Sequence, residues 1–207
     1  GLIAAESNLK NQITEEVNRL KKEYPFLHIE DSVAYFHHGL KLLPQKVIDS
    51  LISKKGDLLD IGAYHGDSAF FLSKYVNNIY SFDISEDSIN RYKRNMRKLG
   101  LINFNIEKLA ITDISGETIK INDNGSAGLS LNRENTGYNS YHVNTITIDD
   151  YCKGHKIKPT LVKADMEGSA LSFVSAAIFT IKKFRPVLSI AVYHNPDEFF
   201  KIKLFLR

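Results

Sequence analysis

An acid and two glycines stand close together in the stretch DLLDIGAYHGDSAFFL, residues 57–72, where an apolar run passes through a turn into a helical pattern. Gly62 lets the backbone approach a ligand closely, and Gly66 admits a tight entry into a helix whose first turn has free N–H groups. A dinucleotide site needs G-x-G-x-x-G, but Tyr64 stands in place of the second glycine. A phosphate-binding loop needs a lysine directly after its last glycine, and none follows Gly66. The spacing therefore favours a nucleoside bound without a pyrophosphate.

A second acid follows at a matching offset. Asp83 lies 23 residues after Asp60, at the end of the next apolar run. A carboxylate at that place in an α/β sheet can accept hydrogen bonds from both hydroxyls of a ribose. The alternative is that Asp83 only caps a helix beginning near Glu86. We favour ribose binding because the acid and the glycine turn occur together.

Three further polar residues are candidates for proton transfer. His194 follows the apolar run RPVLSIAVY and titrates near neutrality, which suits removal of a proton from a hydroxyl. Asp165 and Glu167 alternate after another apolar run, so both can face one site. The alternative for His194 is a structural role in which it bonds to a neighbouring loop. The alternative for Asp165 and Glu167 is a structural cluster in which they bond to Lys163 or to helix N–H groups.

A metal site is the competing interpretation of the same residues. Asp165, Glu167 and His194 offer oxygen and nitrogen ligands, but no compact motif such as H-E-x-x-H is present. His37 and His38 are expected to be ordinary packing or surface residues, the alternative being that one of them contacts the substrate. We therefore predict no metal.

The composition favours one domain of ordinary size. The chain has 207 residues, of which 43% are hydrophobic and 25% charged. Its single cysteine, Cys152, cannot form an internal disulfide, which favours a reducing compartment and predicts a cytoplasmic location. No apolar run approaches the roughly 20 residues that span a bilayer. The opening residues do not read as a signal peptide, and no initiating methionine is present, so we expect the start of a fragment.

The charge balance makes nucleic acid an unlikely partner. The net charge is +3, and the basic residues are partly concentrated in RYKRNMRK at 91–98. A nucleic-acid footprint needs a more basic face with interleaved aromatic residues. We interpret the basic run as a solvated helix surface, and the sequence does not indicate an oligomeric state.

The elements that must position these residues follow from the hydrophobic periodicity. Helices are predicted at 6–23 and 45–56, forming an N-terminal helical cap over residues 1–55. The core, residues 56–207, alternates strands and helices, which predicts a parallel sheet with crossover helices. The strands are expected at 57–63, 78–85, 104–112, 117–123, in the first part of 143–152, at 159–168 and at 185–194. The helices are expected at 67–76 and 86–100, as a short helix at the end of 143–152, at 169–184 and from 195. The segment Asn122–His142, rich in Asn, Ser and Gly, is expected to be a mobile loop that covers the substrate of the predicted site.

Over residues 35–200 the sequence resembles the class I S-adenosylmethionine-dependent methyltransferases of the FkbM type. The resemblance is carried by DIGAYHGDS, YSFDIS, ITIDDYC, LVKADMEGSA and RPVLSIAVYH, in that order. Tyr64 stands where this family usually has Asn or Gly. The chain ends at Arg207, before the last antiparallel strands of such a fold, so we expect a truncated C-terminus.

The resemblance implies an α/β, Rossmann-like, doubly wound and mostly parallel sheet, S-adenosylmethionine as the cofactor, and methyl transfer to a hydroxyl of a small molecule or glycan. An RNA methyltransferase and a non-catalytic binding module are the alternatives. The implied catalytic residues are His194, Glu167 and Asp165. The implied cofactor-binding residues are Asp60, Gly62, Tyr64, His65, Gly66, Asp67, Ser68, Asp83, Ile84, Glu107, Ala110 and Asp165.

Overall fold

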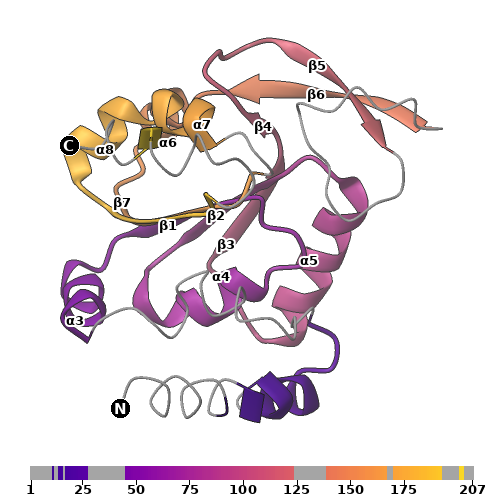
Figure 1. The fold of residues 1–207 in the computed structure, drawn as a ribbon, viewed down its shortest axis with the longest axis vertical. Coiled ribbons are helices and arrows are strands. Elements are labelled where there is room, and N and C mark those ends of the chain that lie inside the picture. Colours follow the sequence, from indigo (N-terminus) through magenta and orange to yellow (C-terminus); the bar gives the residue numbers. More distant parts are fainter. Residues whose placement is uncertain are drawn as a thin grey trace.

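A five-stranded sheet in the order β3-β2-β1-β7-β8 forms the centre of the molecule (Figure 1). The structure, a computed structural model, describes residues 11, 14, 15, 17–27, 45–123, 139–166, 170–192, 201 and 202. All neighbouring strands of this sheet are parallel. The strands are β1 Asp57–Ile61, β2 Ile79–Asp83, β3 Phe104–Lys108, β7 Pro159–Ala164 and β8 Val187–Ile190. The predicted α/β, Rossmann-like class is confirmed.

Helices cover both faces of the sheet, as a doubly wound fold requires. The residues that α3, α4 and α5 bury belong to one hydrophobic cluster, and those of α6 and α7 belong to a second, against which α8 also packs. Figure 1 shows the two groups on opposite sides of the strands. The helices are α3 Gln45–Lys54, α4 Asp67–Leu72, α5 Glu86–Lys98, α6 Ile148–His155, α7 Ala170–Ala176 and α8 Ile178–Phe184.

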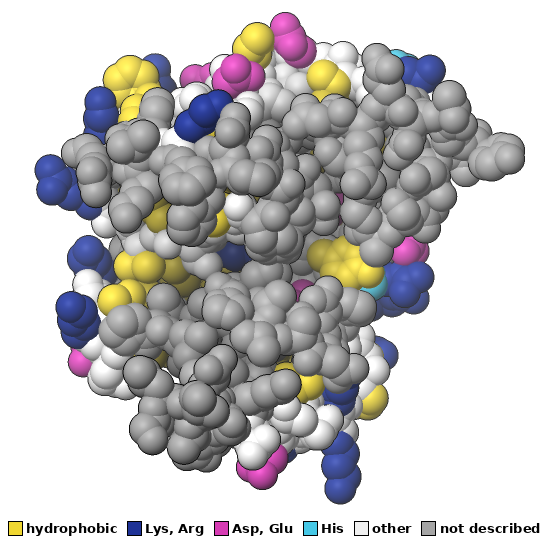
Figure 2. Space-filling model, viewed as in Figure 1, with side chains coloured by type: hydrophobic (Ala, Val, Ile, Leu, Met, Phe, Trp, Pro, Cys, Tyr) yellow, Lys and Arg dark blue, Asp and Glu magenta, His cyan; other side chains and the backbone are white. Residues whose placement is uncertain are grey.

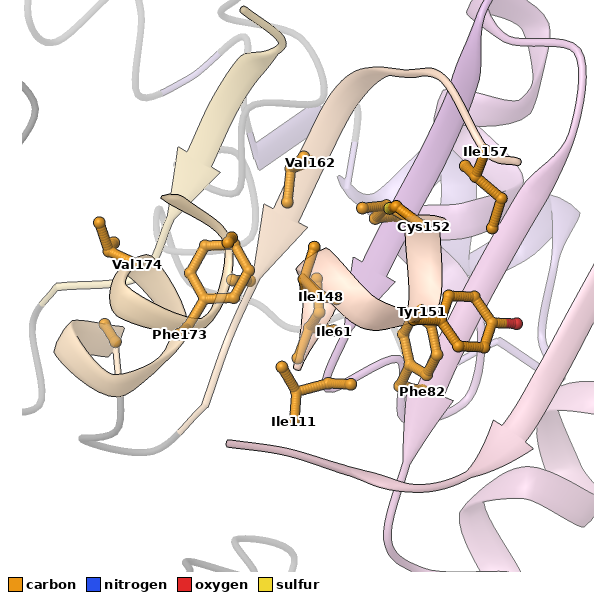
Figure 3. Packing of buried hydrophobic residues seen from close by; sticks show 14 of the residues in the cluster. Ile61, Phe82, Ile111, Ile148, Tyr151, Cys152, Ile157, Val162, Phe173 and Val174 are labelled. Carbon is orange, nitrogen blue, oxygen red and sulfur yellow. The ribbon is translucent and has the colours of Figure 1, made fainter. Parts of the chain in front are cut away.

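The alternation of side chains along each strand produces these two clusters. Leu58 packs in the first cluster and Leu59 in the second, because successive strand residues point to opposite faces. Around the second cluster, Tyr151 of α6 packs against Phe82 of β2 with ring centroids 4.7 Å apart and the planes nearly perpendicular (Figure 3). This edge-to-face contact fixes α6 over the middle of the sheet.

The N-terminal segment joins the first cluster. Residues 17–23 are helical, and Val17 and Leu20 are buried there with Leu51 of α3. Tyr24 meets the ring of Phe70 edge-on at 5.0 Å, which anchors the segment on α4. The proposed division of the chain at residue 55 stays a prediction. Among the described residues, no helix has the length and apolar character that crossing a membrane requires.

Several predicted elements are shorter than expected or divided. The single helix predicted at 169–184 is wrong, because α7 and α8 are separated at Ala177. The carboxylate of Asp149 accepts hydrogen bonds from the backbone N–H groups of Phe179 and Thr180, and this side chain caps the second helix. The predicted strand at 104–112 divides into β3 and β4 Ala110–Ile111, and β8 ends at Ile190.

A small second sheet has the order β4-β6-β5. Strand β5 Thr118–Asp123 pairs antiparallel with β6 Asn139–Ile146. The segment Asn122–His142 is therefore not a loop at either end, and its residues 124–138 lie outside the described residues. Ile84, which directly follows β2, packs against the buried side chains of Ala110, Ile121 and Val143, which places the base of this hairpin beside the carboxyl edge of the large sheet.

Three helices end in the same unusual way. The residue that follows α3, α6 and α8 is basic and has a left-handed backbone: Lys55 has φ 44°, Lys156 has φ 56° and Arg185 has φ 47°. Glycine is the usual residue there, since a side chain in this conformation costs roughly 1–2 kcal/mol. At each of these three helix ends, a basic side chain in the left-handed conformation lowers the stability of the fold relative to glycine.

We predict that Lys156→Gly raises the free energy of unfolding by about 1 kcal/mol, because glycine adopts a φ near 56° without strain. Urea denaturation measures the change. Lys156→Gln is the matched control, since it removes the charge and keeps a strained side chain. Equal stabilities for the glycine and glutamine variants would show that charge, rather than backbone strain, governs this position.

Candidate functional site

The turn after β1 brings the ends of β1 and β7 into contact. Gly62 has φ 70°, and a Cβ atom built on it would lie 2.0 Å from the backbone oxygen of Asp165. Gly66 has φ 86°, and its Cβ would lie 2.6 Å from Met96 of α5. From the sequence, Gly62 is expected to allow close approach of a ligand, whereas in the structure the backbone carbonyl of Asp165 lies against it. Both positions need glycine because the turn packs closely against the end of β7 on one side and against α5 on the other.

Tyr64 occupies the left-handed region in the same turn, with φ 47°. This conformation explains why Asn and Gly suit the position, since both adopt positive φ more readily than a bulky side chain. The Tyr64 ring stacks on His65 with centroids 3.6 Å apart. The backbone N–H of Tyr64 donates to Oδ2 of Asp83 at 2.8 Å, so the turn is tied to the end of β2.

Asp83 binds two backbone groups with its two carboxylate oxygens. Oδ2 accepts from Tyr64, and Oδ1 accepts from the backbone N–H of Ser85 at 2.8 Å. The cap of α5 is Ser85, whose side chain accepts from the N–H of Ser88. The alternative that Asp83 caps this helix is therefore wrong. Its carboxylate instead joins the turn after β1 to the carboxyl edge of β2.

Burial raises the pKa of Asp83 above its ordinary value. The hydrogen bonds from Ser85 and Tyr64 and the positive charge of Lys163 oppose this shift without cancelling it. The folded chain consequently holds the Asp83 proton more tightly than the unfolded chain. The contribution of this group to stability falls as the pH rises from the ordinary carboxyl range through the raised pKa.

A buried lysine lies beneath the turn. Lys163 of β7 is 5% exposed, and its Nζ donates to the carbonyl oxygen of Gly62 at 2.7 Å. The same Nζ lies 3.4 Å from Oδ1 of Asp60, whose side chain is completely buried. From the sequence, Lys163 is expected only as a partner of nearby acids. A lone charged residue in the apolar run PTLVKA was the signal that could have identified it.

The carboxylates around Lys163 keep it charged. Burial would lower its pKa, but the nearby charges of Asp60, Asp165 and Asp67 outweigh this effect and raise the pKa above its usual value. Three carboxylates around one ammonium group leave an excess of negative charge at the carboxyl edge of the sheet. This edge suits a ligand that carries positive charge.

The other predicted cofactor residues surround the same edge. Asp67 and Ser68 open α4, and the carbonyl of His65 accepts from Nδ2 of Asn95 at 2.9 Å. Asp165 follows β7 directly, with its N–H bonded to the carbonyl of Ile61 at 3.0 Å. The structure thus brings the turn, the first turn of α4 and the end of β7 together.

Glu107 lies on β3 beside Phe82 of β2, and the strands β2 and β1 separate β3 from β7. Its carboxylate accepts hydrogen bonds from the hydroxyl of Tyr151 and from Nδ2 of Asn105. Burial, together with this bond to Glu107, raises the pKa of Tyr151. Glu107 is therefore held in one orientation by two neighbours, at the end of the strand adjacent to the one that carries Asp83.

Two predicted catalytic residues, Glu167 and His194, lie outside the described residues. In the part of the chain that the structure describes, no three His, Cys, Asp or Glu side chains are grouped as a metal ion requires.

Comparisons with known proteins place the chain in one family. The family model described as the methyltransferase FkbM domain matches residues 60–207. Among solved structures, a methyltransferase FkbM from Methylobacillus flagellatus KT is similar, with a TM-score of 0.54 and 17% identity. The match covers 73% of this chain and 36% of that protein, so the chain spans about a third of its length.

Two further solved structures match more weakly. A SAM-dependent methyltransferase from Aquifex aeolicus has 24% identity and a TM-score of 0.32, covering 47% of this chain and 49% of that protein. An rRNA methylase from Streptococcus thermophilus has 16% identity and a TM-score of 0.30, covering 40% and 45%. A search of curated proteins finds no match.

We predict that Lys163→Met destabilises the fold by about 3–5 kcal/mol, because it leaves the buried carboxylate of Asp60 without its cation. Chemical denaturation measures the loss. Lys158→Met, at an exposed lysine just before the same strand, is the control and should change stability by about 0.5 kcal/mol or less. Similar losses in the two variants would contradict a special role for the buried ammonium group.

Proposed function

The chain belongs to the FkbM methyltransferase family, and we propose that it binds S-adenosylmethionine at the carboxyl edge of the large sheet and methylates a hydroxyl of a small molecule or sugar. The observation that carries the proposal is the family match, which begins at Asp60 and includes the whole turn. The match supports S-adenosylmethionine as the cofactor, as the sequence predicted. This cofactor supplies an electrophilic methyl group on a sulfonium.

The carboxylate of Asp83 suits a ribose. Each of its oxygens accepts one backbone N–H, and each oxygen of an ionised carboxylate has a second lone pair available. Two neighbouring hydroxyls can donate to these remaining positions. The bonds from Tyr64 and Ser85 already fix the carboxylate, so little side-chain entropy is lost on binding.

The excess of acids around Lys163 suits the positive groups of the cofactor. Asp67 and Asp165 lie near the turn and attract a sulfonium and an ammonium group. Asp60 is completely buried and contacts Lys163, so we assign it a positioning role, exerted through the lysine and the carbonyl of Gly62. The turn residues Gly62, Tyr64, His65, Gly66 and Ser68 provide the backbone around the cofactor.

The adenine side is assigned to the end of β3 and the residues beside it. Glu107 is oriented by Tyr151 and Asn105, and Ile84 packs against Ala110 at the base of the hairpin. An apolar wall and a fixed carboxylate together suit a flat base that carries an amino group.

Methyl transfer to a hydroxyl requires removal of one proton, and positioning supplies much of the rest of the rate. We assign His194 as the general base that removes this proton, with Asp165 and Glu167 as the alternative bases. Asp165 is the one of these three in the described part of the chain, and it lies beside the turn. The assignment of the base, the nature of the acceptor and the cytoplasmic location remain predictions from the sequence.

We expect S-adenosylmethionine and its demethylated product to raise the melting temperature, and NAD to leave it unchanged, because the turn lacks the dinucleotide spacing. Differential scanning fluorimetry on the full chain measures the shifts. Methyl transfer from labelled donor into metabolite and glycan extracts then tests turnover. Stabilisation by NAD alone would refute the assignment of the turn. Binding of S-adenosylmethionine without methyl transfer would indicate a non-catalytic binding module instead of an enzyme.

We predict that Asp83→Ala weakens S-adenosylmethionine binding by about 1–3 kcal/mol, because the ribose hydroxyls lose an ionised acceptor. In the unmodified chain, affinity should fall as the pH falls through the raised pKa of Asp83, since protonation removes acceptor capacity. This part of the pH profile should flatten in the variant. Isothermal titration measures both effects, and Asp87→Ala, on the exposed surface of α5, is the control. An unchanged dissociation constant with an intact fold would remove Asp83 from the site.

A further inference from the structure

Eight exposed basic residues gather at the amino ends of β1, β7 and β8, the edge of the sheet opposite to Asp83. Each lies in the last turn of α3, α6 or α8, or between that helix and the following strand, and none of the eight makes an ion pair in the described structure. We call this surface the amino-edge face. Its basic residues are Lys54, Lys55, Lys153, Lys156, Lys158, Lys182, Lys183 and Arg185.

The strand order brings the three basic groups together. In the sheet β1 pairs with β7, and β7 pairs with β8, with Asp57 opposite Pro159 and Leu161 opposite Val187. Neighbouring strands are about 4.8 Å apart, so the residues that enter them form one surface. Figure 1 shows α3 and α8 at the same end of the molecule, and Figure 2 shows Lys and Arg side chains along that margin.

Helix stabilisation does not explain all of these cations. Basic residues in a last helical turn interact favourably with the helix dipole, which accounts for Lys54, Lys153, Lys182 and Lys183. The residues with left-handed backbones lie beyond those turns, where glycine would remove the strain. Strain that recurs at three positions of one surface indicates a use for the charges.

The acid at the start of β1 does not neutralise the face. Asp57, the first residue of β1, accepts hydrogen bonds from Nδ2 of Asn78 at 2.9 Å and from the backbone N–H of Lys158 at 3.2 Å. Its carboxylate is therefore engaged with neutral groups of the sheet edge. The eight basic residues are exposed, so they present a positive potential to the solvent.

Two apolar side chains stand among the charges. Phe179 of α8 is 75% exposed, and Lys182 and Lys183 follow it at the spacing that shares a helix surface. Ile52 of α3 is 47% exposed, two residues before Lys54. Binding at the boundary between headgroups and acyl chains combines inserted apolar side chains with basic residues that attract anionic lipids.

We propose that the amino-edge face docks on an acidic lipid bilayer, with the lysines over the headgroups and Phe179 inserted between them. Seven of the eight cations are lysines, and clustered lysines are attracted to the negative surface of an acidic bilayer. Nucleic-acid sites instead favour the planar fork of arginine. Docking through this face points the Asp83 edge away from the bilayer, toward an acceptor in the aqueous phase.

Sedimentation with vesicles tests the proposal on the full chain. Vesicles of phosphatidylcholine with about a third phosphatidylserine should bind it, and vesicles of phosphatidylcholine alone should not. The triple variant Lys156→Gln, Lys182→Gln, Lys183→Gln should lower the partition coefficient on the order of 100-fold. The control triple variant Lys93→Gln, Arg94→Gln, Arg97→Gln removes the same charge from the exposed face of α5 and should stay within about threefold.

A second variant separates apolar insertion from charge. Phe179→Ser should lower vesicle binding several-fold and leave its dependence on salt unchanged, because no cation is removed. Circular dichroism melting confirms that each variant is folded. The proposal is overturned by absence of binding to acidic vesicles, by equal losses in the two triple variants, or by tighter binding to a short RNA or DNA duplex, which would identify a nucleic-acid surface.

Discussion

The contact between Lys163 and the turn after β1 is the constraint on which the carboxyl edge depends. The ammonium group of Lys163 is buried at this edge of the sheet. Its charge is tolerated there because it donates a hydrogen bond to the carbonyl of Gly62 and lies beside the carboxylate of Asp60. These bonds hold the chain where Gly62 meets the backbone of Asp165. The same turn presents the N–H of Tyr64 to Asp83. One buried cation thus connects β7, β1 and β2 in the geometry that a ligand would meet.

Part of this arrangement was predictable because it is local in the sequence. Apolar runs predicted all five strands of the large sheet, and the offset of Asp83 from Asp60 predicted that both acids lie at one edge. The engagement of Asp83 by Tyr64 and Ser85 could not be predicted, since a backbone donor leaves no trace in residue type. Nor could the break at Ala177, because alanine favours helix and the capping carboxylate of Asp149 comes from another helix.

The amino-edge face was hidden in the sequence for a related reason. Its lysines belong to three separate segments, each with the ordinary pattern of a helix that ends on basic residues. The most obvious basic run, residues 91–98, lies on α5 and contributes nothing to this face. Only the strand order, which places β7 between β1 and β8, joins the three segments into one surface.

The two edges of the sheet handle charge in opposite ways, and this allows them to act separately. At the carboxyl edge, Lys163 and Asp60 are buried and interact directly, so each depends strongly on its neighbours. At the amino edge, charges are exposed, and water reduces their mutual repulsion. A strand of five residues such as β1 extends about 16 Å, roughly twice the screening length at physiological salt. The exposed cations therefore have little influence on the pKa of Asp83, and a surface bound at one edge need not disturb a ligand at the other.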